Sequence, residues 1–163
     1  MALEFSGPGA AFRRTGTNQA ALIREVDPAA PDLEGYLFPN TYSLPRRATA
    51  EQLVQQMVTA FRDVLTQEIV QRAAARGLTV RQLMTLASLV EKETAKPEER
   101  PLVAAVYTNR LRIGMGMQCD PTVIYALERA GRYDGNITRE DLRFDSPYNT
   151  YRYAGLPPGP IAA

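Results

Sequence analysis

Hydrophobic residues recur at helical spacing along most of the chain, and this pattern predicts a largely helical protein. The clearest such stretch follows Thr49, where Leu53, Met57 and Phe61 lie one helical turn apart. Thr49 and Gln52 have the spacing of a capping box, so the helix is expected to begin there. The pattern predicts further helices over about 18–26, 67–76, 79–94, 97–113 and 120–130, and a short one after Thr138.

In the helix that follows Pro97, the expected apolar face consists of Leu102, Val103, Val106, Tyr107 and Leu111. The glycines Gly77, Gly114 and Gly131 stand where three of the helices are expected to end, because glycine readily adopts the left-handed conformation found there.

Two stretches are predicted to be non-helical. Residues 33–42 indicate an extended, aromatic segment, although Pro39 argues against a central strand. From Phe144 onward, the density of proline and glycine excludes both helix and central strand. The fold class is therefore α+β, predominantly α-helical, with a small extended component. Residues 1–10 are expected to be a flexible leader.

One apolar helical run ends in two carboxylates, Glu91 and Glu93. If Leu83, Ala87, Val90 and Thr94 mark the centre of the buried face, both carboxylates fall about 80° from that centre, on opposite flanks. Periodicity does not choose between them. The plain alternative is that both are solvated residues paired with arginines, and such pairs add little to stability.

The composition limits the chemistry that is available. The chain has no histidine and one cysteine, Cys119, which excludes the usual serine and cysteine triads, an intrachain disulfide and an all-cysteine metal site. Cys119 is best interpreted as a small buried residue. A net charge of +1 gives no indication of nucleic-acid binding. Acid–base catalysis near neutral pH would therefore depend on carboxylates, tyrosines, lysines or the thiol.

Further candidates lie in the second half of the chain. Gln118 is predicted in a loop, and Asp120, which a proline follows, is expected to be a helix N-cap. Tyr125 has the spacing of a core residue. Asn149 and Tyr151 lie in an irregular segment rich in the amide and aromatic side chains typical of sugar sites, although such residues are also common on loop surfaces.

Four blocks of sequence, in order, resemble the endolytic murein transglycosylase family (MltG/YceG-like). They are Leu33-Glu34-Gly35-Tyr36-Leu37-Phe38-Pro39-Asn40-Thr41-Tyr42, then Ala87 to Thr94, then Asn109 to Met115 with Gln118 and Asp120 to Tyr125, and finally Tyr148 to Tyr151 with Gly155 to Ala162. The resemblance extends from about Leu33 to the end of the chain. It implies a lysozyme-like, YceG-like catalytic domain over residues 11–163 that is truncated at the C-terminus.

The resemblance also assigns roles to residues. It implies that Glu93 is the catalytic acid and base of a lytic transglycosylase that cleaves the MurNAc–GlcNAc bond within peptidoglycan strands and leaves 1,6-anhydroMurNAc ends. No metal or cofactor is implied. Substrate contacts are expected from Gln118, Asn149, Thr150 and Tyr151, with support from Glu91, Asp120 and Tyr125.

Members of the resembled family carry a membrane anchor, so the full-length protein is expected at the extracytoplasmic face of the bacterial inner membrane. Peptidoglycan strands are the expected partner, and cell-wall synthases are a family-level expectation. The chain looks like a catalytic-domain fragment cut on both sides. Two alternatives stay open: a non-catalytic glycan-binding module, and a helical interaction domain whose glutamates are simply solvated.

Overall fold

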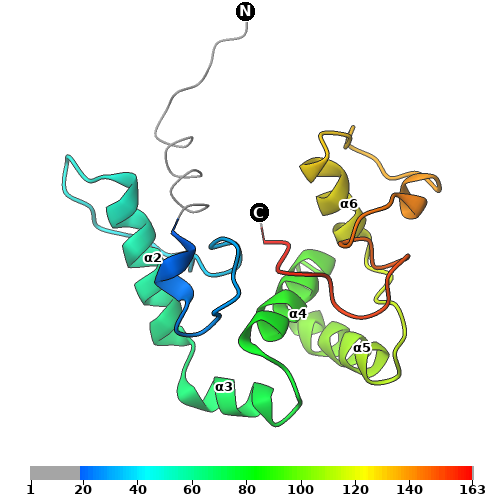
Figure 1. Ribbon diagram of the computed structural model, residues 1–163, viewed down its shortest axis with the longest axis horizontal. Helices are drawn as coiled ribbons and strands as arrows, with labels where there is room; N and C mark the ends of the chain where they lie inside the picture. Colours follow the sequence, from blue (N-terminus) through cyan, green and yellow to red (C-terminus); the bar gives the residue numbers. More distant parts are fainter. Residues whose placement is uncertain (1–18, 163) are drawn as a thin grey trace, which may run out of the picture. The chain divides into compact units, whose positions relative to one another are not determined.

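The computed structural model describes residues 19–162, so the expected leader over residues 1–10 lies outside the described part (Figure 1). The chain divides into two compact units, Met1–Val80 and Arg81–Ala163, which are taken in turn below. The regular structure is helical almost throughout, which confirms the predicted fold class. Within residues 19–162 the extended component includes one parallel bridge, between Gly116 and Gly155. None of the described helices is long and apolar enough to cross a lipid bilayer.

The first unit is built on α2 (Ala50–Val64), which α3 (Gln67–Ala74) follows. The predicted capping box is confirmed, since the Gln52 backbone N–H donates to Thr49 Oγ1 at 3.3 Å and the Thr49 N–H donates to Gln52 Oε1 at 3.0 Å. The buried face of α2 is apolar, as the spacing predicts; its buried residues are Val54, Val58 and Phe61.

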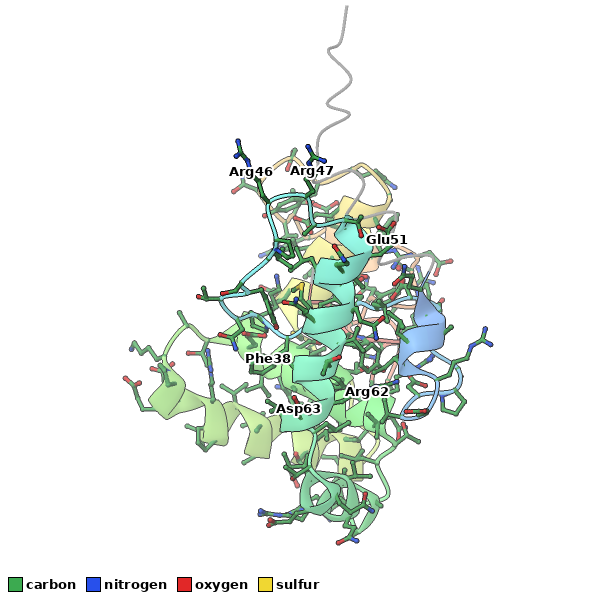
Figure 2. The ribbon with its side chains drawn as sticks, turned by 90° about the vertical axis from the view of Figure 1, so that its left-hand side faces the viewer. Phe38, Arg46, Arg47, Glu51, Arg62 and Asp63 are labelled. Atoms are coloured by element: carbon green, nitrogen blue, oxygen red, sulfur yellow. The ribbon has the colours of Figure 1, made fainter. Side chains whose placement is uncertain are left out.

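The helix predicted over residues 18–26 is shorter in the structure. It is the 3₁₀ helix η1 (Ala20–Ile23). After it, the backbone N–H groups of Val26 and Asp27 both donate to the Ile23 carbonyl, at 3.0 and 2.9 Å. Arg62, near the C-terminal end of α2 (Figure 2), ties the two elements together. It donates to the Leu22 carbonyl and pairs with Glu25 at 3.3 Å.

The aromatic segment that follows η1 packs against α2 without forming a strand. The ring of Tyr36 meets that of Phe61 edge-on, with centroids 5.4 Å apart, and its hydroxyl donates to the buried Asp27 at 2.5 Å. Farther along, the Phe38 N–H donates to the Met57 carbonyl at 3.3 Å, beside the middle of α2 (Figure 2). The chain then runs along α2 toward its N-terminal end.

The second unit contains three α-helices, two short 3₁₀ helices and a long irregular C-terminal segment. The α-helices are α4 (Val80–Glu93), α5 (Arg100–Arg112) and α6 (Asp120–Arg129), and the 3₁₀ helices are η2 (Pro97–Glu99) and η3 (Asp141–Arg143). Gly114 and Gly131 have φ of 69° and 65°, so both end helices as predicted.

The buried face of α4 differs from the predicted one. Val90 and Thr94, which the periodicity placed near its centre, are buried as predicted, but Ala87 is exposed, and Leu86 and Leu89 are buried instead. The C-terminal segment (red in Figure 1) returns to this helix, where the Ile161 N–H donates to Ser88 Oγ at 3.0 Å. The helix therefore buries polar as well as apolar residues. For this reason, hydrophobic spacing alone did not predict correctly which side of the helix is buried.

The apolar face predicted for α5 is also only partly correct. Tyr107 is 4% exposed, but Leu102 is 70% and Val106 is 43% exposed. Tyr107 is the one buried residue among the described residues of α5. The α5 helix is therefore held chiefly through an aromatic residue that carries a polar hydroxyl.

Gly116 permits a close backbone approach that shapes the second unit. A Cβ at this position would lie 2.9 Å from the Thr150 carbonyl oxygen, which is a backbone atom and cannot move away easily. We expect Gly116→Ala to lower the free energy of unfolding by about 1–3 kcal/mol, as overpacking does. Urea denaturation measures the change. The matched control is Gly159→Ala, where the nearest atom, Tyr148 Oη, lies at 3.6 Å and little effect is expected; equal losses in both variants would contradict the argument.

Candidate active site

Glu93 lies at the C-terminal end of α4, with its side chain exposed to solvent. Its Oε2 atom accepts a hydrogen bond of 2.7 Å from the hydroxyl of Tyr107 on α5. The Cys119 thiol, just before α6, lies 3.6 Å from the same oxygen. Three segments of the second unit therefore meet at one carboxylate.

The chain that follows Glu93 is fixed by a small polar cluster. The hydroxyl of the buried Thr94 donates to Glu99 Oε2 at 2.8 Å and accepts the Lys96 N–H at 3.1 Å. The Lys96 ammonium closes the cluster on Glu99 Oε1 at 2.9 Å. The Lys96 and Thr94 hydrogen bonds hold the pKa of Glu99 below its usual value. The end of α4, and with it the Glu93 backbone, thereby has a defined position.

The structure separates the two carboxylates that the periodicity left equivalent. Glu93 stands seven residues after the buried Leu86, so at about 100° per residue the two share one face. Glu91 lies about 160° from Glu93 around the helix axis, and its side chain is exposed. Because the buried face is rotated from the predicted one, Glu93 alone of the two continues it, at the border between core and solvent.

The two groups that face Glu93 are held in their neutral forms. Burial raises the pKa of Tyr107 well above its ordinary value, and hydrogen bonds with Cys119 and Glu93 raise it further. Burial also raises the pKa of the Cys119 thiol to about 12. Both groups therefore remain hydrogen-bond donors at neutral pH. Cys119 is buried as predicted, and a thiol that is protonated in this way is a poor nucleophile.

Thr150, a predicted substrate contact, is 2% exposed and belongs to a buried network under Cys119. Its Oγ1 accepts the Cys119 N–H at 3.1 Å and lies 2.9 Å from Thr122 Oγ1. Thr122 in turn donates to the Cys119 carbonyl at 2.7 Å. These hydroxyls fix the backbone of the residue whose thiol faces Glu93.

Asn149 is fully buried and organises the loop that carries it. Its side-chain amide donates to the carbonyls of Leu142 and Phe144 at 3.1 and 2.8 Å, and its Oδ1 accepts the Tyr151 N–H at 3.0 Å. The structure thus places Asn149 and Thr150 beneath the surface and Tyr151 on it.

Gln118, Asp120 and Tyr151 are the predicted site residues that are exposed beside Cys119. The Tyr151 hydroxyl donates to Asp120 Oδ1 at 2.5 Å, and this bond raises the pKa of Tyr151 to about 12. The charge of Glu93 adds to that shift, so Tyr151 lies within its electrostatic range.

Two predictions for these residues need correction or comment. Asp120 is the first residue of α6, and Cys119 occupies the N-cap position, so Asp120 is not the expected cap; its carboxylate binds Tyr151 instead. Tyr125 is 5% exposed and packs on Tyr148 with ring centroids 4.8 Å apart, as a core residue should.

Sequence reasoning missed Tyr107 as a neighbour of the carboxylate, since it was interpreted as a core residue only. The available signal was chemical: a tyrosine on an otherwise aliphatic face has a hydroxyl that needs a partner. Thr122 was likewise passed over as an ordinary helical residue, although a threonine facing a core also needs one.

Comparison with known proteins identifies the family of the chain. The model of the YceG-like family matches residues 9–163. The chain belongs to the YceG-like family. Two curated relatives, each named endolytic murein transglycosylase, come from Streptococcus pneumoniae (strain D39) and Bacillus subtilis (strain 168). They are 42% and 40% identical over 79% and 80% of this chain.

A crystal structure of a yceG-like protein from Listeria monocytogenes matches 94% of this YceG-like chain with a TM-score of 0.79 and 34% identity. The chain spans 24% of the length of the pneumococcal relative and 35% of the Bacillus relative, and it covers 54% of the Listeria chain. The family resemblance read from the four sequence blocks is thereby confirmed.

The buried threonine network of this YceG-like chain predicts a measurable cost. Thr150→Val keeps the side-chain shape but leaves the buried Cys119 N–H without its acceptor, so we expect a loss of about 1–3 kcal/mol in unfolding free energy. Denaturant titration tests this. Thr108→Val, at an exposed position of α5, is the matched control and should change stability by about 0.5 kcal/mol or less. An unchanged Thr150→Val would mean that the network carries no stability.

Proposed function

We propose that this chain carries the catalytic centre of a peptidoglycan lytic transglycosylase, with Glu93 as general acid and then general base. The observation that supports the proposal best is the setting of Glu93: an exposed carboxyl at the end of a buried helix, with one oxygen held by Tyr107 at 2.7 Å. The names of the curated relatives support the reaction and the substrate class.

The setting suits a reaction that needs one carboxyl group. A glycosidase that uses water needs two, as acid and as base or nucleophile. In a lytic transglycosylase, Glu93 would give its proton to the glycosidic oxygen as the bond to C1 of MurNAc breaks. The resulting carboxylate would take the proton of the C6 hydroxyl, and the C6 oxygen would bond to C1. The proton returns to Glu93 and no water is consumed.

The other nearby carboxylate is engaged elsewhere. Asp120 accepts the Tyr151 hydroxyl at 2.5 Å, which commits one of its oxygens. We propose that this pair holds the exposed Tyr151 ring where it can stack against a sugar, because a ring fixed by its hydroxyl loses little entropy on binding. Asp120 would then orient Tyr151 and take no part in proton transfer.

Gln118 is the second proposed sugar contact. It is exposed and has φ of 50°, the only positive value among the non-glycine residues that the structure describes. This backbone conformation is unfavourable for most side chains, and such strain often marks a functional position. Asn149 and Thr150, which are buried, would act indirectly by fixing the loop and the Cys119 backbone.

On this proposal the substrate is the peptidoglycan glycan strand and the product ends in 1,6-anhydroMurNAc. We further propose, at the level of the family, that the full-length protein acts at the extracytoplasmic face of the inner membrane, where cell-wall synthases would be its partners.

The direct test replaces the proposed acid. We expect Glu93→Gln to abolish cleavage, because an amide cannot transfer the proton, while the fold persists since the amide oxygen can still accept the Tyr107 hydrogen bond. Release of anhydro-muropeptides from purified sacculi measures turnover, and urea unfolding checks the fold. A loss of at least about 10²-fold is expected for removal of a general acid.

Glu91→Gln is the matched control. Because the Glu91 carboxylate lies on the other side of the same helix, this change should leave turnover unchanged. Turnover retained in Glu93→Gln would contradict the assignment. Binding of the unaltered chain to sacculi without anhydro products would indicate a non-catalytic glycan-binding module.

A further inference from the structure

Tyr107 joins the interior of the second unit to the proposed acid. Its side chain is 4% exposed, yet its hydroxyl reaches Glu93 Oε2 at 2.7 Å. A buried tyrosine hydroxyl needs a hydrogen-bond partner, and a backbone carbonyl in the core would serve. Here the partner is instead an exposed carboxylate at the end of another helix.

The hydrogen bonds to Glu93 are asymmetric. Two donors, the Tyr107 hydroxyl and the Cys119 thiol, approach Oε2 at 2.7 and 3.6 Å. Oε1 receives no hydrogen bond from the residues in the described part of the chain. An oxygen that already accepts donors is the less basic of the pair, so the proton of the neutral acid belongs on Oε1. The carboxyl therefore has one fixed oxygen and one oxygen available to a ligand.

We infer that Tyr107 is a positioning residue for the proposed reaction: by holding Oε2, it orients the carboxyl so that Oε1 both gives and takes the proton. This inference rests on the proposed function of Glu93. Tyr107 touches neither the substrate nor the transferred proton. Because burial raises the pKa of its hydroxyl, it keeps donating through the working range of pH.

The test is Tyr107→Phe, which removes the hydroxyl and keeps the ring. We expect kcat for release of anhydro-muropeptides from sacculi to fall about 10- to 100-fold, since a loosely held group misplaces the proton, while KM changes little.

Tyr153→Phe is the matched control, because it also deletes a tyrosine–carboxylate hydrogen bond, of 2.7 Å to Asp145, but one that does not involve Glu93. It should leave kcat unchanged. Placing 3-fluorotyrosine at position 107 keeps a hydroxyl donor and should restore kcat, which separates loss of the hydrogen bond from faulty folding.

The outcomes separate the inference from the function on which it rests. An active unaltered chain with Tyr107→Phe matching it in kcat overturns the inference alone. A lower kcat that 3-fluorotyrosine does not restore also overturns it, because that result describes a structural residue. No anhydro product from the unaltered chain, with Glu93→Gln indistinguishable from it, overturns both.

Discussion

The hydrogen bond between the Tyr107 hydroxyl and Glu93 Oε2 is the interaction around which the second unit is organised. It lies at the exposed C-terminal end of α4, and it is the point at which α5 contributes its one buried side chain among the described residues of that helix. A charged group beside buried residues is stable only if donors replace part of its lost hydration. The Tyr107 hydroxyl and the Cys119 thiol, both kept neutral by burial, supply those donors.

The polar residues behind this bond explain why a loop can hold a site in place. Thr122 and Thr150 bind each other and the backbone of Cys119, and Asn149 ties three backbone groups of its loop together. Within residues 19–162 no buried side-chain nitrogen or oxygen lacks a hydrogen-bond partner. In an irregular segment, side chains must satisfy the backbone groups that a helix satisfies by itself. The result is a loop whose conformation is set from beneath while its outer face stays available.

Local rules predicted the helices well, because capping and helix termination depend on neighbouring residues. The Thr49–Gln52 capping box and the glycines after α5 and α6 are examples. The candidate site depended instead on contacts between residues far apart in the sequence. Glu93 and Tyr107 are 14 residues apart, and Cys119 and Thr150 are 31 apart. Periodicity could not rank Glu91 and Glu93, because it placed Ala87 at the centre of a face that Ser88 and the C-terminal segment in fact define.

The proposed acid and the proposed sugar contacts need different degrees of rigidity. Proton transfer depends on distances of a few tenths of an ångström, so the proposed acid benefits from its place at the end of a packed helix, where Thr94 and Glu99 fix the chain that follows and Tyr107 holds the carboxylate. Recognition of a long polymer tolerates more adjustment, so the proposed sugar contacts, Gln118 and Tyr151, can lie on exposed loops. The Asp120–Tyr151 bond connects the two demands, because it ties an exposed loop residue to the first turn of α6, directly after the cysteine that faces Glu93. A ligand that displaced Tyr151 would thus act on the same short segment that carries a donor of the proposed acid.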